Sequence, residues 1–256
     1  MSSALTDIEC LITVGSSWAD NGIDCAVGDF HGFQTYSNGK VCPDYLASML
    51  KADQRNCAYG GALSGMGNFN FDEPWSGLQW QVEQIRKESS KFPANSLVLY
   101  QCGGANDVIK GTTDLKTLIA TNLNNLKTLV LAGFSRFLFL DVFDLSRYPY
   151  FSTPEGSAQK GVVGTAIAEM NEQFARDIPG FLNQFEQSPV FLHVKTEPLL
   201  NLLFTQFPNN SKPYQRLNGS QPNDRFSWLF FDELHLNSGP HYELAKILFN
   251  KLTNAL

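Results

Sequence analysis

The sequence predicts one three-layer α/β domain in which helices cover both faces of a five-stranded parallel sheet. The chain has 256 residues and is 43% hydrophobic, which suffices for one full core. Short runs rich in β-branched and aromatic residues alternate with amphipathic stretches, the pattern of parallel strands joined by helical crossovers. We find no internal repeat, low-complexity tract or domain boundary. Residues 1–256 are therefore expected to form a single domain.

Five apolar runs are predicted as strands. The run at 55–59 is the weakest, and it ends in a pair of glycines. The predicted strands are 10–14, 55–59, 96–101 (SLVLYQ), 136–142 (RFLFLDV) and 189–194 (PVFLHV).

The stretches between these runs are predicted as helices from their spacing of apolar residues, with Gly133 as one helix stop. A Pro/Asn/Ser-rich stretch at 207–224 is expected to be a long surface loop near the site. The predicted helices are 43–51, 78–88, 115–132, 161–187 with a break near Pro179, and 240–255.

The charge and composition exclude some classes of function. The net charge is −6, and Lys and Arg are scattered, so nucleic-acid binding is disfavoured. No stretch is long and apolar enough to be a transmembrane segment, and the N-terminus as written is no secretory signal. We expect a cytoplasmic protein or the processed form of a secreted one. The oligomeric state is left open.

Five cysteines form no metal-binding pattern. Cys10, Cys57 and Cys102 fall in apolar runs and are expected to be core thiols. A disulfide between Cys25 and Cys42 is the alternative for a secreted form. We expect no metal site and no cofactor.

Residues suited to acyl transfer follow the predicted strands, where ligands bind in doubly wound sheets. Ser17 follows the first strand, Gly60 the second and Asn106 the third, and Asp232 and His235 precede the last helix. Ser17 can act as nucleophile, His235 as its base, and Asp232 as the residue that orients the base. The backbone N–H groups of Ser17 and Gly60 and the amide of Asn106 can form an oxyanion hole.

Each of these residues has a plainer interpretation when taken alone. Ser17 or Asp232 can cap a helix, Gly60 can serve a turn, and Asn106 can be a turn or cap residue. Only the set favours catalysis. Ser16 is a second candidate nucleophile beside Ser17.

The other aromatic and titratable residues have less defined roles. His193 is expected in the core, and His31 and His241 on the surface or in loops. Asp20 and Asp107 are expected to support turns. Four aromatic residues are candidates for the substrate groove, with core packing as the equal alternative: Trp18, Phe30, Trp75 and Trp228.

In these stretches the chain resembles the GDSL family of SGNH hydrolases, whose four motif blocks have counterparts here in order. A further stretch at 36–47 (YSNGKVCPDYLA) is similar to one that the family has between its first two blocks. The chain departs from the family at Ser16, where Asp is usual, and at Trp18, where Leu is common. The four blocks are GSSWADNG at 15–22, NCAYGGA at 56–62, GAND at 104–107 and DELH at 232–235.

The resemblance implies a flavodoxin-like sandwich with strand order 2-1-3-4-5 and a serine esterase or lipase that forms an acyl-enzyme. It implies the triad Ser17, Asp232 and His235, and a small ester as substrate, either an acetylated carbohydrate or a lipid ester. Two alternatives remain: an acyltransferase that uses the same acyl-enzyme, and a non-catalytic binding protein with the same pocket.

Overall fold

The structure, a computed structural model, describes residues 7–24, 31, 35–111, 114–214 and 227–254. Its centre is a sheet of parallel strands in the order β2-β1-β3-β4-β5, which confirms the predicted order. The first and third predicted strands have the observed bounds. The strands are β1 Cys10–Val14, β2 Asp53–Asn56, β3 Ser96–Gln101, β4 Arg136–Leu140 and β5 Val190–Val194.

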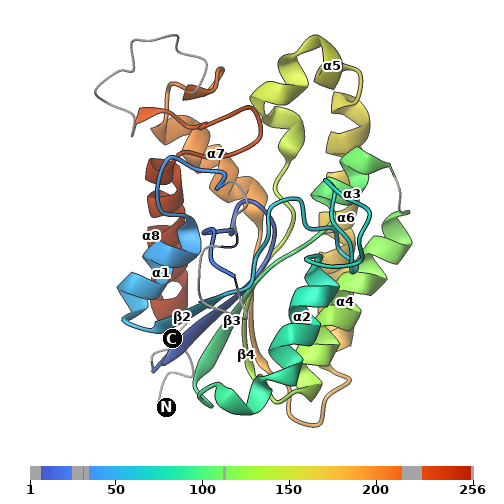
Figure 1. The fold of residues 1–256 in the computed structure, drawn as a ribbon, viewed down its shortest axis with the longest axis vertical. Helices are drawn as coiled ribbons and strands as arrows, with labels where there is room; N and C mark the ends of the chain where they lie inside the picture. Colours follow the sequence, from blue (N-terminus) through green and yellow to red (C-terminus); the bar gives the residue numbers. More distant parts are fainter. Residues whose placement is uncertain (1–6, 25–30, 32–34, 112–113, 215–226, 255–256) are drawn as a thin grey trace.

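Helices lie on both faces of this sheet, as predicted (Figure 1). One face is covered by α1 Cys42–Leu50, α7 Thr196–Gln206 and α8 Ser238–Asn254. The other is covered by α2 Leu78–Lys87, α3 Ala105–Lys110, α4 Leu115–Leu131 and α6 Lys160–Leu182. Shorter helical segments are η1 Ser89–Lys91, η2 Leu145–Arg147, η3 Pro149–Ser152 and α5 Pro154–Ser157.

The central and edge strands differ in burial. Every residue of β1 is buried, as expected for a parallel strand with helices on both faces. The edge strand β2 is Asp53–Asn56, so the predicted range of 55–59 is wrong. Its sequence DQRN has exposed polar residues at its start, and such polar edges discourage pairing with other chains. The apolar pattern that guided the prediction belongs to the buried residues that follow.

The long helix α6 continues through Pro179, so the predicted break is wrong. A proline inside a helix removes one backbone hydrogen bond, but Pro179 stands in the last turn, so little of the helix follows the missing bond. Phe174, Ile178 and Phe181 are buried on both sides of it. Their common apolar face stabilises the last turn.

Helix α7, which follows β5 almost directly, has no counterpart among the predicted elements. Leu199, Leu200 and Leu203 are buried along one face of it, at a helical spacing that the sequence does carry. The stretch expected as a surface loop is described only up to Tyr214, and Phe207 and Tyr214 are both buried. The expectation of a surface loop is wrong for these two side chains.

The cysteines differ from the prediction in two respects. Cys10, Cys42 and Cys102 are free and buried, and burial raises the pKa of the Cys10 thiol to about 11. Cys57 is disulfide-bonded, so its expected thiol is wrong. Because Cys42 is free, the alternative pairing of Cys25 with Cys42 is also wrong, and Cys25 itself lies outside the described residues. Within the described ranges, no helix is long and apolar enough to cross a membrane.

Candidate active site

Ser17, His235 and Asp232 form one hydrogen-bonded chain. The Ser17 Oγ lies 2.8 Å from His235 Nε2, and His235 Nδ1 lies 2.8 Å from both carboxylate oxygens of Asp232. The first and last members of this chain are more than two hundred residues apart in sequence. A serine, an imidazole and a carboxylate in this order can deprotonate the hydroxyl and hold the imidazole in one tautomer.

The turn after β1 presents Ser17. The N–H groups of Ala19 and Asp20 both donate to the carbonyl of Ser16, at 2.9 and 3.1 Å, and this curls the chain around Ser17. Gly15 precedes the turn, and its N–H and C=O both bond the side-chain amide of Gln81 on α2, at 2.9 and 2.8 Å. Gln81 is fully buried. The turn that carries the predicted nucleophile, called the nucleophile turn below, is therefore held on its strand side by one buried amide.

A second tight turn presents His235. Asp232 Oδ1 accepts the Leu234 N–H at 2.8 Å, and the Phe231 N–H donates to the carbonyl of His235 at 2.8 Å. Burial raises the pKa of Asp232, but the hydrogen bond and charge of His235 and the nearby N–H groups outweigh it. The pKa of Asp232 thus lies below its usual value, and the carboxylate stays ionised beside the imidazole.

Asn106 lies on α3, beside the same opening. Its amide nitrogen donates one hydrogen bond to the carbonyl of Ala62 at 2.9 Å, which leaves its second N–H for another acceptor. Asp107 turns away and accepts the N–H and hydroxyl of Ser64, both at 3.0 Å. Burial raises the pKa of Asp107 despite these bonds. Asp107 therefore supports the loop after β2, the role expected for it.

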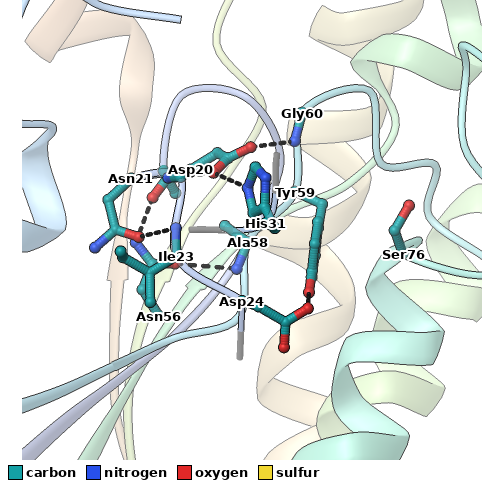
Figure 2. Close-up of polar contacts among 12 residues, drawn as sticks. Asp20, Asn21, Ile23, Asp24, His31, Asn56, Ala58, Tyr59, Gly60 and Ser76 are labelled. Carbon is teal, nitrogen blue, oxygen red and sulfur yellow. Dashed lines mark hydrogen bonds and ion pairs between the residues drawn. The ribbon is translucent and has the colours of Figure 1, made fainter. Parts of the chain in front are cut away.

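The backbone N–H of Gly60, predicted as an oxyanion donor, has another partner. This N–H donates to Asp20 Oδ2 at 2.6 Å, as Figure 2 shows, and is therefore already engaged. A side chain at position 60 would collide with the ring of Tyr36, which explains the glycine. The next residue, Gly61, has a φ of +77°, and its N–H has no acceptor among the described residues.

Asp20 links the first two motif blocks, at 15–22 and 56–62, through hydrogen bonds. Besides Gly60, it accepts the Gly22 N–H at 2.7 Å and pairs with His31 Nε2 at 2.9 Å (Figure 2). The His31 side chain is only 2% exposed, so His31 lies in a loop, one of its two expected settings, but not on the surface. His241 is buried within α8, so its expected position on the surface or in a loop is wrong. His193 lies within 3.4 Å of Asp141 and is half-buried.

Sequence reasoning missed Tyr36, which covers the imidazole. Its ring centroid lies 4.6 Å from that of His235. Burial and the charges of Asp20 and Asp232 raise the pKa of Tyr36, so the phenol stays neutral. The only signal for it is its position at the start of the 36–47 stretch.

A small cavity, called the recess below, opens beside Ser17. Its volume is about 50 Å³, and Ser17, Asn106 and His235 lie along it. Its remaining walls are mostly apolar: Trp18, Ile109, Val142, Phe143, Leu145 and Leu234. Of the other candidate groove residues, Trp75 packs among Phe71, Tyr59 and Trp80, Trp228 packs against Tyr214, and Phe30 lies outside the described residues. Of the three candidates that the structure describes, Trp18 alone lines the recess.

The described residues contain no group of three His, Cys, Asp or Glu side chains that could hold a metal ion. The hydrogen-bonded chain from Asp232 to Ser17 needs none to activate a hydroxyl.

Solved structures share this fold over nearly the whole chain. A carbohydrate acetylesterase from Sinorhizobium meliloti, Est24, is 11% identical with a TM-score of 0.59, and the match covers 97% of this chain and 100% of that one. A lipolytic protein of the G-D-S-L family from Veillonella parvula is 12% identical with a TM-score of 0.57 and the same coverage. An aryl esterase from M. smegmatis is 12% identical with a TM-score of 0.55, again with 97% and 100% covered. No protein-family model and no curated protein matches the chain.

The fold is thus the α/β fold of GDSL-type hydrolases, as the motif blocks predict. The proteins named above that share it are esterases or lipolytic proteins. At this level of identity the likeness concerns the fold, and the chemistry of this chain is argued from its own residues.

Proposed function

We propose that this protein is a serine esterase that cleaves small carboxylic esters through an acyl-enzyme. The observation that carries the proposal is the chain of 2.8 Å contacts from Asp232 through His235 to Ser17. His235 takes the proton of Ser17 as the Oγ attacks the ester carbonyl, and it returns that proton to the departing alcohol. Water then attacks the acyl-enzyme. His235 takes the proton of that water and returns it to the Ser17 Oγ as the carboxylic acid is released.

The oxyanion of the tetrahedral intermediate needs donors beside Ser17. The Ser17 N–H makes no hydrogen bond within the described structure, and the Asn106 amide keeps one free N–H, so both remain in the proposal. In place of Gly60 we propose Gly61 as the third donor, because the Gly60 N–H serves Asp20. Each such donor lowers the barrier by about 3 kcal/mol in well-studied acyl transfer enzymes.

The acyl group is proposed to be short. A cavity needs a volume of about 10–15 Å³ to hold one water-sized group. The recess has a volume of about 50 Å³ and therefore holds three to five such groups. An acetyl or propionyl group has this size. Acetylated sugars, one of the two substrate classes left open by the sequence, fit better than long-chain lipids.

The test measures hydrolysis of p-nitrophenyl acetate by the wild type and by two matched variants. Ser17→Ala is expected to abolish hydrolysis because it removes the nucleophile, while Ser16→Ala keeps most of it. Circular dichroism checks that both variants fold. Full activity in Ser17→Ala contradicts the proposal.

Product analysis with an added alcohol separates the two enzymatic alternatives. A hydrolase releases acetate even when alcohol is present, whereas an acyltransferase yields the new ester. A folded wild type that hydrolyses no ester favours the non-catalytic binding protein.

A further inference from the structure

Trp18, the residue after the nucleophile, is fixed in place on three sides. It is 7% exposed, and its ring centroid lies 4.1 Å from that of Phe143 and 5.3 Å from that of Tyr148. Its indole N–H donates to the carbonyl of Leu234 at 3.2 Å, next to His235. The ring therefore has little freedom to move when a substrate enters.

A second space lies behind this ring. It is a cavity of about 20 Å³ between the sheet and the face covered by α1, α7 and α8. Its lining is almost entirely apolar, and the leucines come from both layers: Leu99, Leu140, Leu199, Leu244 and Leu248. Cys42 and His241 are among the few other side chains along it.

Three residues line both the recess and this inner cavity: Trp18, Gln101 and Phe143. They form the partition between the two spaces. Gln101 also accepts the Ser16 N–H at 3.3 Å, and it therefore serves the nucleophile turn. Trp18 is the largest of the three side chains and the one that directly follows Ser17.

We propose that Trp18 is the residue that limits the acyl group to a short chain, by closing the recess against an apolar cavity that would otherwise extend it. This inference rests on the proposed esterase function. A longer acyl chain that points away from the oxyanion donors meets the indole. Loss of the indole joins the recess to the leucine-lined space.

The expected gain follows from the burial of methylene groups. Each methylene that leaves water for an apolar environment favours binding by about fourfold. An octanoyl chain carries six more methylenes than acetyl, and burial of even two of them changes the ratio of rates by more than about tenfold. A ring that serves only to stabilise the fold would lower the rates for all chain lengths in the same proportion.

The experiment compares kcat/KM for p-nitrophenyl acetate, butyrate, hexanoate and octanoate, which differ only in the acyl chain. The variants are Trp18→Phe, Trp18→Leu and Trp18→Ala, and Trp80→Ala is the matched control. Trp80 is a half-buried tryptophan on α2 that packs against Tyr59 and Trp75. The ratio of octanoate to acetate is expected to rise by at least about tenfold in Trp18→Ala, less in Trp18→Leu and little in Trp18→Phe, and to stay unchanged in Trp80→Ala.

A second substitution tests the path of the chain. In the Trp18→Ala background, Leu199→Phe fills the inner cavity and is expected to restore the preference for acetate. If the double variant keeps the octanoate activity, the chain does not enter this cavity and the inference is wrong.

The outcomes separate this inference from the proposed function. A wild type that hydrolyses none of the four esters overturns the proposed function, and the inference with it. An active wild type whose ratio is unchanged in folded Trp18→Ala and Trp18→Leu overturns the role of Trp18 alone. Thermal unfolding followed by circular dichroism establishes that the variants are folded, and Trp18→Leu provides the test where Trp18→Ala does not fold.

Discussion

The two faces of the sheet support the candidate active site in different ways. On the side of α2 and α4, buried amides hold the backbone: Gln81 bonds both polar groups of the Gly15 peptide unit, and Asn122 bonds the N–H and C=O of Gly103 at 3.0 Å. Gly15 directly follows β1, and Gly103 lies two residues beyond the end of β3. On the side of α1, α7 and α8, apolar packing around Trp18 leaves a small cavity.

The hydrogen bonds on one face and the apolar packing on the other suit two different roles in the candidate active site. Hydrogen bonds have strict geometry, so the amide side can hold Ser17 and the oxyanion donors at fixed distances. Apolar contacts have no preferred direction and respond to volume, so the other side can decide the size of the acyl group. Substitutions on the amide side are expected to change the rate, and those on the apolar side to change substrate length or stability.

The largest effect is expected at Asn106. Asn106→Ala removes a proposed oxyanion donor and should lower kcat for p-nitrophenyl acetate by about 10² to 10³-fold, with little change in KM. Steady-state kinetics measures it. Asn106→Asp keeps the shape but replaces the donor with a negative charge, and it should be at least as slow. An unchanged kcat in both variants removes Asn106 from the oxyanion hole.

A smaller effect is expected at Gln81. Gln81→Met keeps the length of the side chain but leaves the Gly15 N–H and C=O unpaired, at a cost of about 1–3 kcal/mol of stability. Because the nucleophile turn loses its support, kcat should also fall by about tenfold. Chemical denaturation and steady-state kinetics measure the two effects. Gln79→Met on the exposed side of the same helix is the control, and an equal loss in both variants contradicts the positioning role.

The apolar side makes a prediction about acid stability through His241. Burial, with the nearby His235, lowers the pKa of His241 to about 3 in the folded state, against about 6.5 when unfolded. Between pH 3 and pH 6.5 the unfolded chain binds more protons at His241 than the folded protein does. The contribution of His241 to the free energy of unfolding is therefore fully present above about pH 6.5 and is lost as the pH falls. At pH 5 the loss is about 2 kcal/mol.

His241→Leu removes this proton linkage, so the free energy of unfolding should fall less steeply with decreasing pH than in the wild type. The measurement is the free energy of unfolding between pH 7 and pH 4.5, in the wild type and in the variant. The lowered pKa of Asp232 contributes its own acid loss, but it does so in both proteins and cancels in the comparison. Curves that run parallel would show that His241 is not the source of the linkage.

The strand order follows from the family resemblance. The residues themselves bring together Ser17, Asp232 and His235, because glycine-flanked turns after apolar strands have strong local signals. The sequence does not predict Gln81, Asn122 or Tyr36, since a polar residue in a helix or loop gives no sign of a partner far away in the chain. The sequence likewise does not distinguish the roles of Gly60 and Gly61. Only the bond from Gly60 to Asp20 reveals which of two adjacent glycines keeps a free N–H.

Covalent labelling reports whether His235 activates Ser17 as a nucleophile. The folded wild type is treated with a fluorophosphonate near pH 7.5, and the modified peptide is identified by mass spectrometry. We expect a single label on Ser17, much slower labelling in His235→Ala and none in Ser17→Ala. A folded wild type that stays unlabelled, or one in which Ser16 carries the label, would contradict this expectation.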